Sequence, residues 1–246
     1  MYTYSLEHKV YLKKIRKEKI LINVFRILIL FLFLLIWEIL SKYNIINTIL
    51  RVDFIKHISI TLYEVFISFI LSTFIGIFIA FMMWRFKIFS KVIDPYITIF
   101  NSLPKVALGP LFIIWVGAST NSIIVMALTI SIFTTIISIY NGFISVNKNY
   151  ILLLKSFSCS RLQLFRYVIL PSNISNIIST LKINISLTLI GVIMGELLVS
   201  KMGLGYLIMY GSQVFNLDLV ICSIFILGII SYVMYLVINT IEKRLI

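Results

Sequence analysis

The sequence predicts an all-α polytopic membrane protein with six transmembrane helices. Hydrophobic residues make up 61% of the 246 positions and the mean hydropathy is +1.08, whereas a soluble domain is about 45–50% apolar. The apolar residues gather in runs of about 20 with almost no charge, the length that a helix needs to cross a bilayer. These runs do not alternate polar and apolar residues, which excludes the strands of a membrane barrel.

The first three predicted spans are separated by short polar segments. Residues 1–19 form a basic segment, and the span at 20–40 follows it without a small-residue cleavage pattern, so we expect an uncleaved first helix. A mixed stretch completes the segment 20–57, and the second span at 58–84 ends in the basic turn RFKIFSK. The third span, 92–115, contains Pro95, Pro104 and Pro110.

The last three predicted spans enclose the longest polar segment of the chain. The sequence GASTN leads into the fourth span at 122–142, and the polar segment 143–170 follows it. The fifth span at 172–199 and the sixth at 219–240 are joined by an expected surface loop. Residues 58–242 are expected to form one transmembrane domain, because no internal repeat or Gly/Ser linker divides them.

The basic residues predict how the spans are oriented. Six spans place both termini on one side, and fifteen of the 22 lysines and arginines fall in the four segments on that side, against four on the other. Because cytoplasmic loops carry the excess of Lys and Arg, this asymmetry predicts N-in and C-in. It also accounts for the net charge of +13 without a nucleic-acid partner.

The stretch SFSCSRLQLFRYVILP (156–171) predicts two short amphipathic helices in the polar segment. Before the break at Ser158, apolar residues recur at helical spacing. Ser160 and Gln163 form an S-x-x-Q capping box, which predicts a second helix from Arg161 to about Val168. Leu170 precedes Pro171 and is expected to leave helical geometry. Such helices either lie on lipid or enter a groove on a partner.

Backbone breaks in the third span predict a gate. Pro104 lies about 18 Å from the start of this span, near the middle of the bilayer. Pro104 and the pair Gly109–Pro110 should kink the helix. Lys105 sits at the break, where a charge is costly and typical of a functional site. The alternative is a lysine held by a neighbouring carbonyl or extended along the kink.

The fifth span carries further polar candidates. Lys182 lies about ten residues from its cytoplasmic start, and it is a candidate for the translocation path. Glu196 lies near the outer end, where it is expected to pair with Lys105 or Lys201 or to reach the interface. Glu64, near the outer end of the second span, is expected at the interface. Serines at helical spacing indicate close helix packing.

Several motifs in order resemble the permease subunits of ATP-binding-cassette importers of the nitrate/sulfonate/taurine branch. SLPKVALGPLFIIWVGAST (102–120) and LIGVIMGELLVSKMGLGYLI (189–208) resemble the third span and the fifth span with its outer loop. The stretch SRLQLFRYVILP resembles the second half of the loop that docks on the ATPase. The first half departs from that pattern, with Ser158 at the usual glycine and Leu152–Leu154 at the usual E-A-A.

The resemblance implies a type I importer transmembrane domain in the cell membrane. The implied partners are a cytoplasmic ATPase dimer, an extracytoplasmic solute-binding protein, and a second copy of the chain. It further implies that ATP is bound by the ATPase and that this chain carries no cofactor. The implied docking residues are those of the loop: Leu154, Phe157, Ser158, Ser160, Arg161, Gln163, Leu164, Phe165, Arg166 and Pro171.

Motifs for chemistry are missing from the sequence. None of the ten glycines precedes a lysine, so the chain has no Walker A phosphate loop. Cys159 and Cys222 form no Cys/His cluster that would predict a metal site. The chain is therefore expected not to be an enzyme. The alternative function is a self-sufficient secondary transporter or channel, which would usually show inverted repeats.

Overall fold

The computed structural model describes residues 6–40 and 52–245. The chain divides into two compact units, Met1–Ile45 and Ile46–Ile246. In the first unit a single helix, α1 (Leu6–Leu40), contains the predicted first span and continues through the basic segment before it. Most of the mixed stretch predicted to follow this span, residues 41–51, lies outside the described residues.

The second unit is a bundle of long helices, which agree with the predicted spans within a few residues except at the third span, where the helix is broken. Its long helices are α3 (Phe54–Arg85), α4 (Lys87–Ser102), α6 (Thr120–Ile144), α10 (Ile174–Val199) and α12 (Leu217–Leu245). Four of them, α3, α6, α10 and α12, are long and apolar enough to cross a membrane. The bent pair Lys87–Ser102 and Lys105–Val116 makes a fifth if it is counted as one span. The count of six and the orientation stay predictions.

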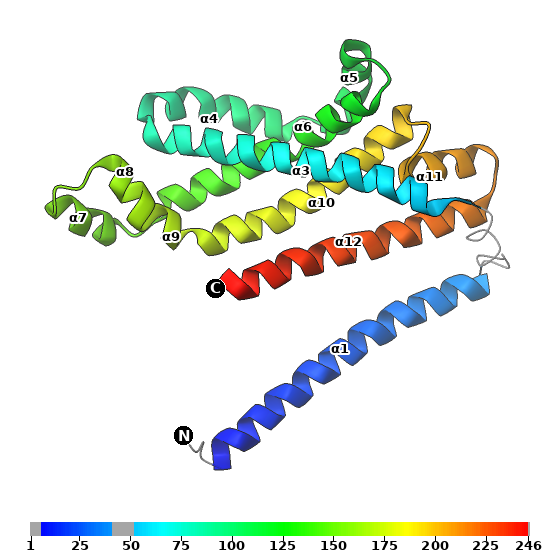
Figure 1. The fold of residues 1–246 in the computed structure, drawn as a ribbon, viewed down its shortest axis with the longest axis horizontal. Coiled ribbons are helices and arrows are strands. Elements are labelled where there is room, and N and C mark those ends of the chain that lie inside the picture. The colour runs from blue at the N-terminus through cyan, green and yellow to red at the C-terminus, as the bar shows by residue number, and fades with distance from the viewer. Residues whose placement is uncertain (1–5, 41–51, 246) are drawn as a thin grey trace. The chain divides into compact units, whose positions relative to one another are not determined.

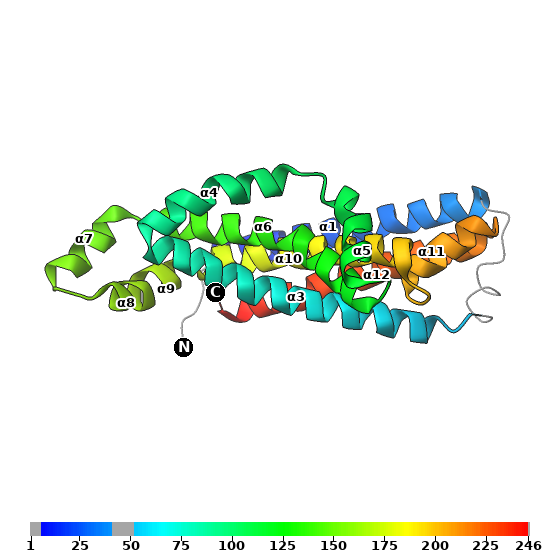
Figure 2. The same ribbon diagram turned by 90° about the horizontal axis from the view of Figure 1, so that it is seen from above.

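Short helices lie at the two ends of this bundle (Figures 1 and 2). At one end are α7 (Lys148–Ser156), α8 (Arg161–Leu164), the π-helical turn η2 (Phe165–Ile169) and α9 (Leu170–Ser172). At the other end is α11 (Leu204–Gln213). The sequence predicts a surface loop there, but Leu204 and Leu207 of α11 are buried, so the loop is a packed helix.

Small residues let α10 and α6 approach each other closely. A Cβ atom on Gly191 of α10 would lie 2.5 Å from the Cα of Ala127 on α6, and one on Gly195 would lie 2.9 Å from the side chain of Ile123. Close approach at glycine is the usual way in which membrane helices gain packing contacts.

Buried side-chain hydrogen bonds connect α10 to its neighbours. Asn184 accepts from the hydroxyl of Ser72 at 3.1 Å and donates to the hydroxyl of Thr73 at 2.8 Å, both on α3. The hydroxyls of Thr180 and Ser138 of α6 lie 2.7 Å apart. The serines predicted to pack this helix, Ser172, Ser175, Ser179 and Ser186, are exposed on this chain. The asparagines and threonines of the opposite face make the contacts instead.

Candidate functional site

The predicted capping box starts the second short helix of the 143–170 segment. The Ser160 amide donates to Gln163 Oε1 at 2.8 Å, and the Gln163 amide donates to Ser160 Oγ at 3.3 Å. These two bonds satisfy amides that a helix start leaves free. Of the residues on the predicted apolar face, Leu164 and Val168 are buried and Phe165 is half-buried.

Ser158 ends the first short helix in the conformation that glycine usually supplies. Its φ is +55°, in the left-handed region. The Cys159 amide donates to the carbonyl of Leu154 at 3.4 Å and the Ser158 amide to the carbonyl of Lys155 at 2.9 Å. This is the hydrogen-bond pattern of a Schellman motif, which normally has glycine at the left-handed position. Ser158 therefore makes the same break as a glycine, with its Cβ retained.

The expectation that Leu170 leaves helical geometry is wrong. Leu170 has φ −64° and ψ −50°, and its amide donates to the carbonyl of Phe165, five residues back. The wider π turn carries the chain into α9, which has Pro171 in its first turn. The helical path instead breaks at Asn173, with φ −110° and ψ 5°.

Phe165 anchors the loop to the ends of two long helices. Its ring centroid lies 4.7 Å from that of Phe81 and 5.1 Å from that of Trp84, both on α3. It lies 5.3 Å from the ring of Phe143 on α6. Nearby, an Arg161 guanidinium nitrogen donates to the carbonyl of Arg85 at 3.4 Å. The loop is thus joined to α3 and α6 by a compact aromatic cluster.

The opposite side of the loop exposes large apolar side chains. Phe157 is 75% exposed and Leu162 is 65% exposed. Of the predicted docking residues, those exposed are Phe157, Ser158, Ser160, Arg161, Gln163, Arg166 and Pro171. Leu154 is half-buried, and with Leu164 and Phe165 it packs in the cluster around Phe143. Only part of the predicted docking set is therefore accessible on this chain.

The predicted kink at Pro104 is a sharp turn. The axes of Lys87–Ser102 and Lys105–Val116 differ by 90°, and a single 3₁₀ turn, η1 (Lys105–Leu108), joins the break to α5 (Gly109–Val116). The Lys105 ammonium donates to Asn101 Oδ1 at 2.8 Å and to the carbonyl of Ile130 at 3.3 Å. The Thr134 hydroxyl also donates to Asn101. The break therefore holds a small polar cluster between α4 and α6.

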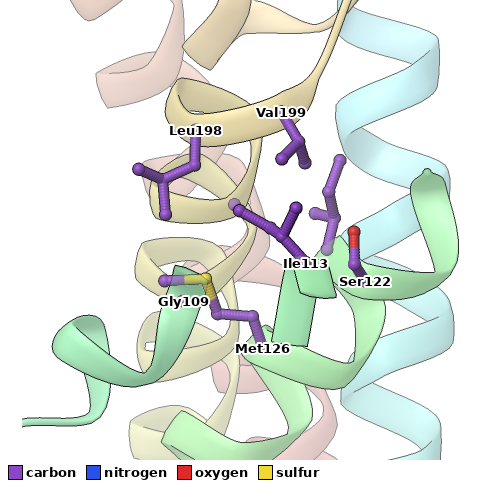
Figure 3. A pocket seen from close by; sticks show the side chains of 8 residues that line it. Gly109, Ile113, Ser122, Met126, Leu198 and Val199 are labelled. Carbon is purple, nitrogen blue, oxygen red and sulfur yellow. The ribbon is translucent and has the colours of Figure 1, made fainter. Parts of the chain in front are cut away.

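Gly109 and Pro110 begin α5 beside a narrow apolar crevice (Figure 3). Residues of α5, α6 and α10 line it: Gly109, Ile113, Ser122, Ile123, Met126, Gly195, Leu198 and Val199. A Cβ on Gly109 would lie 2.6 Å from a methyl carbon of Leu198. The α5 segment thus packs against the C-terminal part of α10.

Lys182 is held by the last helix of the chain. Its ammonium lies 2.5 Å from Glu242 Oε2 on α12 and donates to Asn239 Oδ1 at 3.3 Å. It also lies over the ring of Tyr235, 5.6 Å from the centroid. These contacts connect the N-terminal half of α10 to the C-terminal end of α12.

The expected pairing of Glu196 with a lysine is wrong. Glu196 is buried, its Oε1 accepts from the Thr61 hydroxyl at 2.6 Å, and its Oε2 accepts from the Gly205 amide at 2.6 Å. Glu64 is not interfacial either, because only 1% of its surface is exposed. Thr61 was not predicted as a partner of Glu196. The signal was the spacing of His57, Thr61 and Glu64, which lie on one face of a helix.

The structure brings together some of the predicted path residues and separates others. Pro104, Lys105, Gly109 and Pro110 meet at the break before α5. Lys182 and Glu196 lie at different depths of α10, about 21 Å apart along its axis. In the described part of the chain, no group of three or more His, Cys, Asp and Glu side chains is placed to hold a metal ion.

Comparison with known proteins identifies relatives of the chain. Residues 72–246 match the family model for the binding-protein-dependent transport system inner membrane component. A probable ABC transporter permease of Haemophilus influenzae is 30% identical over 191 residues, which are 78% of each chain. The formylaminopyrimidine transport permease of Halalkalibacterium halodurans is 26% identical, with 78% of this chain and 77% of that protein covered. The taurine transport permease of Escherichia coli is 25% identical, with 77% of this chain and 69% of that protein covered.

Solved structures share the fold. The inward-facing MetNI methionine ABC transporter superposes with a TM-score of 0.68 at 16% identity, over 78% of this chain and 95% of that one. An amino acid ABC transporter with histidines superposes with a TM-score of 0.62 at 18% identity, over 82% of this chain and 97% of that one. The fold is therefore that of an ABC importer permease. Since the family model spans most of the sequence, the chain belongs to the binding-protein-dependent transport system inner membrane components, the permease subunits of ABC importers.

Proposed function

We propose that two copies of this chain form the translocation path of an importer in the cell membrane, with N-in and C-in topology and six spans in each copy. The segment 143–170 docks on a cytoplasmic ATPase dimer, which binds the ATP, while this chain binds no cofactor. An extracytoplasmic binding protein delivers the solute to the opposite side. The cycle is alternating access, driven by the different affinities of ATP for the two states.

The observation that carries the docking assignment is the two-sided character of the loop. Its inner side is fixed to α3 and α6 through Phe165, whose ring packs against Phe81, Trp84 and Phe143. Its outer side exposes Phe157 and Leu162 at the end of the bundle opposite α11. Exposed apolar side chains in an amphipathic helix fit a groove on a partner.

The docking assignment is tested by co-purification with the ATPase encoded beside this gene. Phe157→Asp places a charge in the docking face and is expected to release the ATPase. Phe215→Asp is the matched control, because Phe215 is also a highly exposed phenylalanine, 92% against 75% for Phe157, and it lies beyond the other end of the bundle. Undiminished co-purification of the Phe157→Asp variant would contradict the assignment.

The proposed solute is small: a sulfonate, nitrate or taurine-like solute, or another small organic molecule such as a vitamin precursor. The support is that the relatives named above include permeases for taurine and formylaminopyrimidine. On this chain the path is assigned to the break at Pro104, Lys105, Gly109 and Pro110. Two of the three donors of the Lys105 ammonium are used by Asn101 and Ile130, which leaves one for a solute.

Lys182 and Glu196 border this path in the proposal. Their contacts with α12 and α11 hold α10 in position. The test is uptake of candidate solutes into proteoliposomes that hold the permease, the ATPase and the binding protein. Lys105→Met is expected to reduce uptake at least tenfold without releasing the ATPase. Lys201→Met, an exposed lysine at the outer end, is the control and is expected to keep uptake.

A further inference from the structure

Two carboxyl groups are buried together where α3, α10 and α11 meet. Glu64 of α3 and Glu196 of α10 are each 1% exposed. Burying an ionised carboxylate costs several kcal/mol unless charges or hydrogen bonds compensate it. Among the described residues, neither carboxyl group lies within 4.0 Å of a Lys, Arg or His nitrogen. The negative charge of the two carboxyl groups must therefore be compensated by something other than a salt bridge.

Glu196 has the hydrogen bonds that an ionised carboxylate needs. Each of its oxygens accepts one bond at 2.6 Å, from the Thr61 hydroxyl and from the Gly205 amide in the first turn of α11. A Cβ on Gly203 would lie within 2.6 Å of both oxygens, so the chain at Gly203 closes directly over the carboxylate. Hydrogen bonds to the charged form favour that form.

Glu64 is in the opposite situation. Neither of its oxygens accepts a hydrogen bond from any described residue. Thr61 and Glu64 are three residues apart on α3 and share one face, so the Thr61 contact with Glu196 brings Glu64 to the same carboxylate. Glu64 and Glu196 are therefore buried at the same junction of α3 and α10. As long as both are acceptors, no hydrogen bond joins them.

We propose that Glu64 and Glu196 form a proton-binding site, in which Glu64 is a neutral carboxylic acid that donates its hydrogen to the carboxylate of Glu196. Without a proton, Glu64 can only accept hydrogen bonds, and no group donates one to it. With one proton it becomes a donor, and the negative charge buried at the site falls from two to one. Two carboxyl groups in contact cannot both be ionised without a large repulsion. This inference does not depend on the solute or on the docking partners.

The proton stabilises the attachment of α11. The same cluster holds the first turn of α11, because the Leu204 amide donates to Thr61 Oγ1 at 3.0 Å and the Gly203 amide to His57 Nδ1 at 3.0 Å. Loss of the proton would place two negative charges under this turn. The folded protein holds a proton that an exposed glutamate releases at neutral pH, so stability falls as the pH rises through the loss of that proton.

Other ionisable groups near the cluster are few. The helix α5 carries none, and the outer half of α6 contributes the hydroxyl of Thr120 as its polar neighbour. The ionisable groups on the other elements packed there are His57 of α3, Lys201 before α11, Tyr206 and Tyr210 of α11, and Asp218 of α12. None of these is within ion-pair distance of either carboxyl group.

The test is infrared spectroscopy of the full-length protein in lipid nanodiscs. A protonated carboxylic acid gives a carbonyl band that moves to lower frequency in D₂O, and the unaltered protein is expected to show it at neutral pH. Glu64→Gln supplies an amide donor of the same shape, and it is expected to remove this band. Glu242→Gln, which removes a carboxylate paired with Lys182, is the control and is expected to keep it.

Thermal unfolding gives an independent measurement. The melting temperature of the unaltered protein is expected to fall between neutral and mildly alkaline pH, while that of Glu64→Gln stays constant. An unaltered protein without the band at neutral pH would overturn the proposal, even if the variant fails to fold. The full band in Glu64→Gln would overturn it as well.

Discussion

At the scale of single residues, Ser158 shows how an unusual amino acid fulfils a backbone requirement. The Schellman motif that ends α7 needs a left-handed residue, and serine takes that conformation with φ +55°. An L-residue with a Cβ pays roughly 1–2 kcal/mol in this region relative to glycine. Ser158 is exposed and the backbone hydrogen bonds around it are intact. The cost is therefore backbone strain at this residue, and the fold of the loop is unchanged.

Ser158→Gly is therefore expected to stabilise the protein by about 1 kcal/mol. Ser156→Gly, two residues earlier in the last turn of α7, is expected to destabilise it by up to about 1 kcal/mol, because glycine is unfavourable in helical geometry. Thermal unfolding of the two variants in the same detergent measures the difference. Equal shifts of the two melting temperatures would contradict the left-handed conformation of Ser158.

The ion pair of Lys182 and Glu242 is a second feature at this scale. Both side chains are partly exposed, at 21% and 27%, so solvent screens part of their attraction. A double-mutant cycle with Lys182→Ala and Glu242→Ala is expected to give a coupling free energy of about 1 kcal/mol. The cycle is measured by thermal unfolding in detergent. Additive effects of the two substitutions would show that the pair contributes nothing.

At the scale of elements, the contact between α6 and α10 depends on glycine. A Cβ at Gly191 would meet the backbone of Ala127 at 2.5 Å, and backbone atoms cannot move aside as a flexible side chain does. The two helices would have to separate, with the loss of the neighbouring contacts at Gly195 and Ile123.

Gly191→Ala is expected to destabilise the protein by about 1–3 kcal/mol, the usual cost of overpacking. Gly228→Ala in α12 is the matched control, because no atom lies within 4 Å of its Cβ position. That control is expected to be neutral or stabilising, since alanine is the better helix former by about 1 kcal/mol. The two melting temperatures, measured side by side, test the tightness of the α6–α10 contact.

The long helices and the capping box were predictable from sequence because their signals are local. Apolar runs define α3, α6, α10 and α12, and S-x-x-Q defines the start of α8. The direction in which a polar side chain points depends on the partner helix, so Glu64 was assigned to the interface although it is buried. For the same reason, the prolines indicated a kink at Pro104 but not its angle of 90°.

Two other elements, α11 and the π turn η2, were not predicted from the sequence. The helix α11 lies in a segment that was expected to be a surface loop, and its first turn is fixed by Thr61, Glu196 and His57 from distant helices. The π turn η2 carries Leu170 in helical geometry although it precedes Pro171. The partners that fix α11 lie far away in the sequence, so the local sequence of α11 does not indicate them.

At the scale of the whole molecule, the loop has to perform two tasks with different residues. In the proposed complex, Phe157 contacts the ATPase, while Phe165 connects the loop to α3 and α6. Binding and transmission of movement are then separable, because Phe157 is exposed while the ring of Phe165 packs against α3 and α6.

Phe165→Ala is accordingly expected to keep the ATPase bound and to reduce uptake about tenfold or more, since the aromatic cluster with Phe81, Trp84 and Phe143 is lost. Phe78→Ala is the control, because Phe78 is 60% exposed on α3 and lies outside this cluster. Co-purification and uptake into proteoliposomes are measured on the same preparations. Release of the ATPase by Phe165→Ala, with the fold intact, would show that anchoring and docking are not separate.

The helix α10 has 26 residues and is therefore about 39 Å long. Just before its inner end, Asn173 donates to the carbonyl of Ile169 in the loop, and near its outer end Glu196 holds the first turn of α11. In the proposed transport cycle, α10 would therefore link a movement of the loop to a movement of α11. A tilt of about 10° at the loop would carry its outer end about 7 Å, so a small displacement on one side of the membrane becomes an opening on the other.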